Sequence, residues 1–311
     1  MLRRLAYYQQ RTLARASTAT TSMGVAAGQL RYLPRRSSHH AAGYHGDAGD
    51  ETNRSPDPRG RKNIPPKSYF TPPPSSLIAN RLNPTDRSKI LQNTKTSRQH
   101  LTPQLALHLI TEECTIYHKP IDDSFCFSAE PFWGFFWPGG QALTRFILDN
   151  GRLFSGKTVL DVGCGCGASS IAALVAGASL VTANDIDTVA LQATLLNAEL
   201  NMVEPVRLEL DETNLIGAPC DRYDVILIGD LFYDAEIADV LMPWLNRLAI
   251  AGKDIYIGDP GRHGLTETRM RHMIHHARYE LPPNVCLENN GFSHANVWKF
   301  VAKANEFEKM S

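Results

Sequence analysis

The stretch that decides the fold is Lys157-Thr158-Val159-Leu160-Asp161-Val162-Gly163-Cys164-Gly165-Cys166-Gly167-Ala168. It begins with an apolar run rich in branched residues, which is typical of a buried strand. Glycines then alternate with small residues, and residues 169–176 form an apolar segment that predicts a buried helix. A strand, a tight glycine-rich turn and a helix N-terminus together predict the opening of a nucleotide-binding α/β unit.

The glycine turn alone leaves two ligands open. Gly163, Gly165 and Ala168 match the dinucleotide pattern G-x-G-x-x-G/A, so NAD is one candidate. A second apolar stretch ends at Asp185, about twenty residues further on, where a carboxylate can bind ribose hydroxyls of either NAD or S-adenosylmethionine. Asp161, close before the first glycine, and the compactness of the turn favour S-adenosylmethionine, because this ligand has no pyrophosphate to bind.

The N-terminal region has an unusual composition. Residues 1–46 contain arginines among Ala, Ser, Thr and Leu but no Asp or Glu, which predicts a mitochondrial transit peptide; a disordered basic tail is the alternative. Residues 47–100 are rich in Pro, Ser, Arg, Asn and Thr, and we expect them to form a disordered linker. Residues 101–311 are then long enough for one domain with a full core.

Composition also bounds the partners. The formal net charge is zero, which gives no indication of a nucleic-acid partner. No apolar segment is long enough to cross a bilayer, so we expect no membrane partner. The six cysteines lack paired C-x-x-C spacing, so we expect no metal site. We expect the protein to be a monomer.

Helices and strands are predicted to alternate through the domain. The predicted helices are residues 101–113, 141–148, 169–176, 187–201, 235–248 and 267–278, and the predicted strands are residues 157–162, 179–184, 206–210, 223–229, 254–258, 285–287 and 297–301. We expect the last two strands to pair antiparallel, because only a short polar loop joins them. The alternation predicts a doubly wound, Rossmann-like α/β sheet that is mostly parallel, with an antiparallel last strand.

Functional residues are expected at the carboxyl ends of the strands, where open α/β sheets bind their ligands. Asp230 leaves the fourth strand there, and Tyr233 follows three residues later. Such a pair can hold an amine beside a methyl donor, although Asp230 or Asp234 could instead cap a helix. Residues 130–141 are rich in aromatics and suit a wall over a flat ligand, with ordinary packing on the sheet as the alternative.

Residues 101–301 resemble the seven-strand lysine methyltransferases of family 16. The resemblance is carried by residues 101–103, 135–143, 159–163, 183–187, 229–234 and 257–262. The Trp-Pro-Gly-Gly-Gln and Gly-Asp-Pro-Gly-Arg blocks within them are more selective than the glycine turn. The resemblance implies S-adenosylmethionine as cofactor and a mitochondrial matrix protein as substrate, namely the beta subunit of the electron transfer flavoprotein.

The resemblance also implies roles for individual residues. Gly163, Gly165 and Asp185 would hold the cofactor, and Trp137 would lie by its adenosyl group. Asn214 would lie near the adenine, with Asp211 as a competing choice.

Asp230 and Tyr233 match an Asp/Glu-x-x-Tyr/Phe motif that lines the lysine channel in this family. An aromatic channel would lower the lysine pKa, while Asp230 would orient the amine and stabilise the cation that forms. The competing hypotheses are a methyltransferase of another protein or of a small-molecule amine, an NAD(P)-linked oxidoreductase, and a non-catalytic binding module with the same fold.

Overall fold

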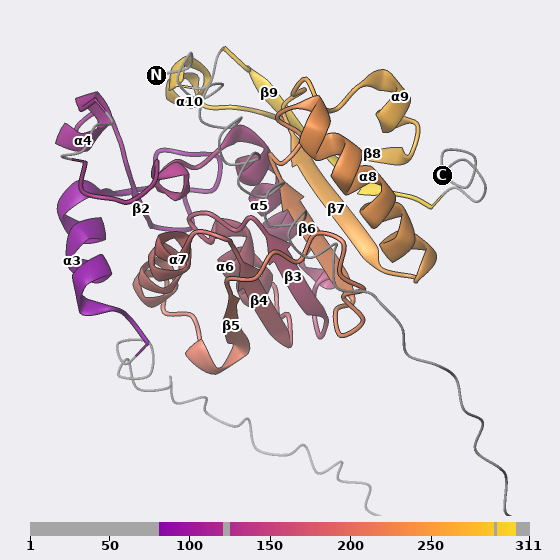
Figure 1. Cartoon of the computed structure of the whole chain (residues 1–311), viewed down its shortest axis with the longest axis horizontal. Coiled ribbons are helices and arrows are strands. Elements are labelled where there is room, and N and C mark those ends of the chain that lie inside the picture. The colour runs from indigo at the N-terminus through magenta and orange to yellow at the C-terminus, as the bar shows by residue number, and fades with distance from the viewer. Residues whose placement is uncertain (1–80, 121–124, 289–290, 303–311) are drawn as a thin grey trace, which may run out of the picture. The chain divides into compact units, whose positions relative to one another are not determined.

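The structure is a computed structural model and describes residues 81–120, 125–288 and 291–302. These residues belong to one compact unit, Thr71–Ser311 (Figure 1). The predicted transit peptide, residues 1–46, lies outside the described residues, as do residues 47–80 of the predicted linker.

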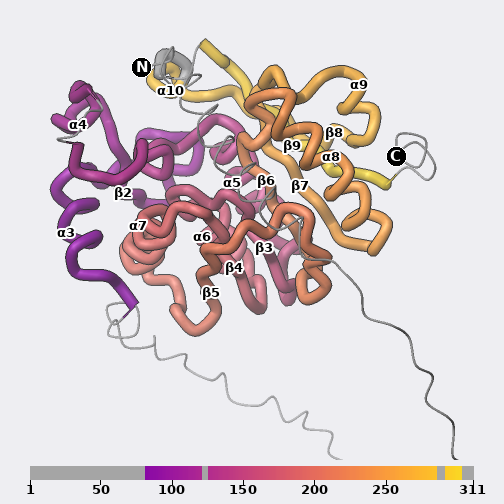
Figure 2. The backbone as a smooth tube through the Cα atoms, viewed as in Figure 1, coloured from indigo at the N-terminus to yellow at the C-terminus, as the bar shows by residue number. Residues whose placement is uncertain are grey.

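A seven-stranded sheet forms the centre of this unit, in the order β5-β4-β3-β6-β7-β9-β8. The strands are β3 (Thr158–Val162), β4 (Leu180–Asn184), β5 (Leu208–Asp211), β6 (Val225–Gly229), β7 (Asp254–Asp259), β8 (Met273–Glu280) and β9 (His294–Phe300). Strands β3 to β7 pair in parallel, whereas β9 runs antiparallel to both β7 and β8. The predicted α/β sheet with an antiparallel last strand is therefore confirmed, as the tube in Figure 2 lets the reader follow.

Helices cover both faces of the sheet. They include α5 (Pro138–Asp149), α6 (Ala168–Val175), α7 (Thr188–Leu200) and α8 (Ala235–Ile250). Parallel crossovers are right-handed, and the path from β3 to β4 runs in the opposite direction across the sheet from the path from β6 to β7. Helices α6 and α8 therefore lie on opposite faces. Asp187 caps α7, because its carboxylate accepts from the amide of Val189 at 2.9 Å.

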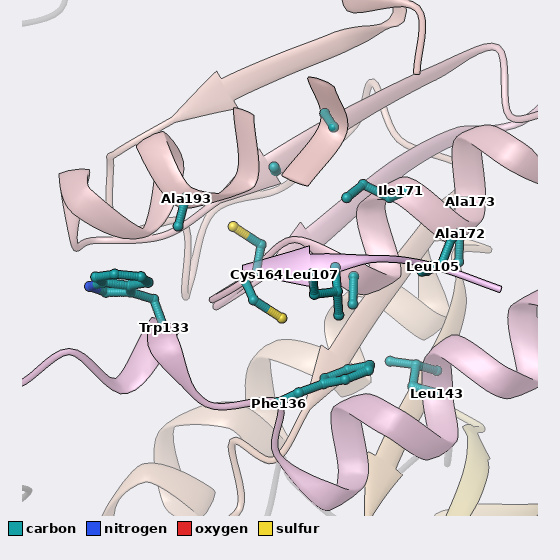
Figure 3. Packing of buried hydrophobic residues seen from close by; sticks show 14 of the residues in the cluster. Leu105, Leu107, Trp133, Phe136, Leu143, Cys164, Ile171, Ala172, Ala173 and Ala193 are labelled. Atoms are coloured by element: carbon teal, nitrogen blue, oxygen red, sulfur yellow. The ribbon is translucent and has the colours of Figure 1, made fainter. Parts of the chain in front are cut away.

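The central strands have apolar neighbours on both faces. Val225, Ile226, Leu227 and Ile228 of β6 are fully buried, as expected for a parallel sheet covered by helices. Figure 3 shows Trp133, Phe136, Leu143 and Cys164 within the same cluster of buried side chains. No helix in the described part of the chain is long and apolar enough to span a membrane.

The region before the sheet differs from the prediction. Helix α3 (Pro84–Asn93) and strand β1 (Lys95–Ser97) lie in the segment predicted to be disordered, and strand β2 (Leu107–Leu109) lies in the predicted helix 101–113. The reason is visible in the burial: Leu105, Leu107 and Leu109 alternate at the strand period of two, and all three are buried. The remaining short elements before the sheet are α4 (Thr115–His118) and the 3-10 helices η1 (Phe132–Gly134) and η2 (Gly151–Leu153), and a third 3-10 helix, η3 (Pro205–Arg207), lies between α7 and β5.

The C-terminal region also differs from the prediction. The predicted helix 267–278 is a short helix, α9 (Glu267–Met270), followed by strand β8, and the predicted strand 285–287 lies in helix α10 (Pro283–Glu288). Strand β8 is an edge strand that pairs only with β9, and most of its residues are partly or fully exposed. Its sequence therefore carries little of the apolar alternation that identifies a half-buried strand.

Candidate active site

The strand order reverses between β3 and β6, and this position locates the candidate site. Strand β4 lies on one side of β3 and β7 on the far side of β6, so the connections leave these two strands in opposite directions. Open α/β sheets bind ligands in the crevice that such a reversal leaves at the carboxyl ends of the strands. At these ends the chain places the glycine turn after β3, Asp185 after β4, Asp230 after β6 and Asp259 at the end of β7.

The glycine turn has a backbone that residues with side chains rarely adopt. Gly163, Gly165 and Gly167 have φ angles of +65°, +54° and +76°. A Cβ atom added at Gly167 would also lie 2.5 Å from the side chain of Thr194, so no side chain fits there. The turn can therefore present its backbone directly to a ligand.

Asp185 is tied to the glycine turn. Its Oδ2 accepts a hydrogen bond from the Gly165 amide at 2.9 Å, and its Oδ1 accepts from the Asp187 amide at 3.0 Å. Each oxygen keeps a second acceptor site, because an ionised carboxylate offers about four in total. Burial raises the pKa of Asp185 to about 6. The predicted positions Gly163, Gly165 and Asp185 therefore lie together and can hold a ribose.

Asp161 has a different setting. It lies within β3, is 3 % exposed, and accepts a hydrogen bond from the Ser170 hydroxyl of α6 at 2.7 Å. Burial raises its pKa to about 6. Its observed contact joins the strand to the helix that follows, so a direct role in cofactor binding stays a prediction.

Trp137 and Asn214 lie in contrasting environments. Trp137 directly precedes α5 and is half-buried, with its Nε1 donating to the Phe132 carbonyl at 3.0 Å. Asn214 is exposed and accepts from the Ile216 amide within its own loop. Asp211, the competing choice, contacts the site directly, because its carbonyl accepts from the Asp185 amide at 3.1 Å.

Asp230 is not a helix cap. That role belongs to Asp234, whose carboxylate accepts from the Ile237 amide at 2.9 Å. Asp230 is 8 % exposed and has a φ angle of +56°, which is uncommon for a residue other than glycine. Its Oδ2 accepts from the Gly140 amide at the start of α5, at 2.8 Å, and its Oδ1 accepts from Arg262 Nε at 2.7 Å. The main chain thus aims a buried carboxylate at the site.

Tyr233, the second residue of the predicted channel motif, is partly buried. Burial raises the pKa of its phenol to about 12. The hydroxyl therefore stays protonated at neutral pH and can act as a hydrogen-bond donor.

Sequence reasoning assigned no role to Asp259 or Arg262. Asp259 is fully buried, and its Oδ1 accepts from the amides of Gly261 and Arg262 at 2.7 and 2.8 Å. Its Oδ2 has no hydrogen-bond partner among the described residues. Burial and the nearby charge of Asp230 raise the pKa of Asp259 to about 7. The available signal was the position of Asp259 at the end of the fifth strand, within the selective Gly-Asp-Pro-Gly-Arg block.

Several known proteins are similar to this chain. The family model described as "Ribosomal protein L11 methyltransferase (PrmA)" matches residues 143–249. A solved ribosomal protein L11 methylase from Lactobacillus delbrueckii subsp. bulgaricus has a TM-score of 0.41 and 20% identity, covering 65% of this chain and 97% of that one. A magnesium protoporphyrin IX methyltransferase from Synechocystis, solved with bound S-adenosylmethionine, has a TM-score of 0.40 and 17% identity, covering 52% and 76%.

Curated relatives are more similar in sequence. The electron transfer flavoprotein beta subunit lysine methyltransferase of Xenopus laevis is 45% identical over 217 residues, covering 69% of this chain and 86% of that protein. The human protein of the same name is 38% identical over 222 residues, covering 70% and 83%. A Caenorhabditis elegans homologue is 36% identical over 230 residues, covering 68% and 93%. The chain therefore belongs to the electron transfer flavoprotein beta subunit lysine methyltransferase family.

Proposed function

We propose that this protein transfers the methyl group of S-adenosylmethionine to lysine side chains of the electron transfer flavoprotein beta subunit. The relatives that share most of its length are named for this activity. One observation carries the proposal: the glycine turn and Asp230 meet at the reversal of the strand order. A Cβ built on Gly163 would lie 3.1 Å from the side chain of Leu231, the residue after Asp230.

The residues present fit the cofactor. Asp185 keeps acceptor sites for two ribose hydroxyls, and Gly163 and Gly165 have no side chain that would hold a ligand away from the backbone of the turn. Trp137 would provide an aromatic surface for the adenosyl group. When bound, S-adenosylmethionine supplies a methyl carbon on a positively charged sulfur. The chain's task is to align a neutral lysine amine with that carbon.

Asp230 and the aromatic residues would have different effects on the lysine amine. Apolar surroundings lower the pKa of a lysine and so favour the neutral nucleophile. Asp230 would orient the amine and stabilise the positive charge that grows on its nitrogen during the transfer. The hydroxyl of Tyr233 stays protonated and would serve as a hydrogen-bond donor rather than as a base.

Methylation of the purified flavoprotein beta subunit tests the proposal. We expect lysine peptides of the subunit to gain methyl groups, seen by mass spectrometry, when the protein and S-adenosylmethionine are both present. Asp230→Asn should lower turnover by on the order of a hundredfold, as for other preorganised electrostatic groups. It should leave S-adenosylhomocysteine affinity nearly unchanged, because Asp230 acts on the amine. Full activity of Asp230→Asn would disprove its catalytic role.

We further propose that the protein acts in the mitochondrial matrix. Support comes from the acid-free, arginine-rich composition of residues 1–46 and from the substrate named for its relatives. Fusion of residues 1–60 to a fluorescent reporter should direct it to mitochondria. A diffuse cytosolic signal would contradict this assignment.

A further inference from the structure

Arg262 joins the two buried carboxylates of the site. Its Nε and Nη2 both lie 2.7 Å from Asp230 Oδ1, while its backbone amide donates to Asp259 Oδ1 at 2.8 Å. Its guanidinium also stands over the ring of Trp137, with the carbon 5.6 Å from the ring centroid. The side chain of Arg262 is only 16% exposed, so its contacts are largely shielded from water.

The turn after β7 explains why the side chain reaches back to β6. Asp259 accepts from the amides of Gly261 and Arg262, and this closes a tight turn directly after the strand. Gly261 has a φ angle of +105°, which glycine permits at no steric cost. Asp259 therefore fixes the backbone of the turn, and the turn directs the guanidinium at Asp230.

Counting acceptor sites on Asp230 shows what the protein leaves open. An ionised carboxylate offers about four such sites. Arg262 takes two on Oδ1, and the Gly140 amide takes one on Oδ2. One acceptor site on Oδ2 remains, and its direction is set because the guanidinium fork and the amide prevent rotation of the carboxylate.

The charges of this cluster favour a cation at the open position. When both carboxylates are ionised, Asp230 and Asp259 carry two negative charges against the single positive charge of Arg262. Burial and the charge of Asp230 already raise the pKa of Asp259. The positive charge that develops on a lysine nitrogen beside Oδ2 during methyl transfer would make the cluster neutral.

We infer that Arg262 is a positioning residue for methyl transfer, which holds Asp230 so that one Oδ2 acceptor site faces the substrate lysine. The inference rests on the proposed function and deepens it. In this role Arg262 acts on the amine through Asp230. The rigid planar fork of arginine is essential to the role, because the ammonium of a lysine is a single point charge on a flexible stem.

Arg262→Lys is the variant that tests this role, because it keeps the positive charge between the buried carboxylates. We expect turnover to fall about tenfold or more per active site, with the active sites counted by S-adenosylhomocysteine titration. The KM for the flavoprotein subunit and the affinity for S-adenosylhomocysteine should each change less than about threefold, since Asp230 stabilises charge that develops during transfer. A purely structural role would lower the number of active sites and leave turnover per site unchanged.

Arg222→Lys is the matched control. Arg222 also pairs with a carboxylate, Glu209, at 2.8 Å, and stacks on Tyr223 at 4.8 Å, but it precedes β6 at the opposite end of the strand. It should keep wild-type turnover. In the double variant Asp230→Asn/Arg262→Lys, the arginine change should add no further loss, because a residue that acts through Asp230 has nothing left to position.

Two results would overturn the inference and leave the proposed function standing. One is wild-type turnover per active site in Arg262→Lys. The other is a double variant Asp230→Asn/Arg262→Lys whose loss of turnover is the product of the two single losses. If the wild-type protein methylates no lysine of the flavoprotein subunit, the proposed function fails, and the inference fails with it. Thermal melting of each variant shows whether the active sites counted by S-adenosylhomocysteine titration belong to folded protein.

Discussion

At the scale of single residues, carboxylates at neighbouring strand ends differ in what surrounds them. Asp185 faces two backbone amides, Asp161 faces one serine hydroxyl, and Asp230 faces a guanidinium. An arginine adds a positive charge, whereas amides and hydroxyls add only dipoles. Residues of one type can therefore bind a ribose, join a strand to a helix, or orient an amine.

Asp185→Ala is expected to weaken S-adenosylhomocysteine binding by about 1–3 kcal/mol, because hydrogen bonds to a charged acceptor are lost. Isothermal titration measures this change. Asp187→Ala is the matched control: Asp187 also accepts a backbone amide, that of Val189, but it does so as a helix cap. It should lower stability by about 1 kcal/mol and leave the affinity unchanged. If wild type and Asp185→Ala bind S-adenosylhomocysteine with equal affinity, the ribose lies elsewhere.

At the scale of elements, the Trp-Pro-Gly-Gly-Gln block (residues 137–141) and the Gly-Asp-Pro-Gly-Arg block (residues 258–262) pack directly against each other. Gly139 lies in the first turn of α5 and Gly258 lies in β7, and a Cβ on Gly139 would lie 2.2 Å from the Gly258 carbonyl oxygen. The Cβ built on Gly139 would also lie 2.7 Å from Asp230 Oδ2. Helix α5 can therefore bring its N-terminal amides to Asp230 only because both contact positions lack a side chain.

Gly139→Ala is expected to push α5 away from β7, since the atoms it meets are backbone atoms that cannot rotate aside. We expect a loss of about 1–3 kcal/mol in the free energy of unfolding, the usual cost of overpacking, and a loss of methyl transfer. Urea unfolding and the methylation assay measure the two effects. In Gly140→Ala the new Cβ would lie 3.6 Å from Phe136, an ordinary contact, so this neighbour should tolerate the change. Equal stability of the two variants would contradict the close packing.

At the scale of the whole sheet, buried carboxylates make stability depend on pH. Burial raises the pKa of Asp161 and Asp185 to about 6 and that of Asp259 to about 7, from an ordinary value of 3.8. The folded protein therefore binds protons that the unfolded chain releases between about pH 4 and pH 7. The stability these three groups provide is complete below pH 4 and is lost as the pH rises through 6 to 7.

Asp161→Asn tests this dependence, because asparagine keeps an acceptor for Ser170 and removes the titrating charge. From about pH 5 to pH 8, the wild-type protein should lose more unfolding free energy than the variant, by on the order of 1–3 kcal/mol. Urea unfolding at both pH values gives the loss of unfolding free energy in each protein. Subtracting the loss in the variant from that in wild type cancels the contributions of the other titrating groups. A variant whose stability falls as steeply as that of wild type would show that Asp161 does not contribute.

The sequence alone determined the parallel core of the fold and the position of Asp185 at the carboxyl end of the second predicted strand. Strands β3, β4 and β6 are buried on both faces, β6 reads as a continuous apolar run, and Gly163, Asp185 and Asp230 follow directly after the three strands. This information is local, because burial on both faces and a tight turn each impose their own residue pattern. The channel position of Asp230 came from the family resemblance rather than from the pattern itself.

The tertiary structure decided the edges of the sheet and the partners of its charged groups. Strand β8 has little apolar alternation of its own and forms because β9 supplies its hydrogen bonds, whereas the short strand β2 alternates buried leucines and pairs with β1. Arg262 lies 32 residues beyond Asp230 and reaches it only because β6 and β7 are neighbours in the sheet. Contacts of this kind depend on which strands lie side by side, and residue spacing along the chain does not contain that information.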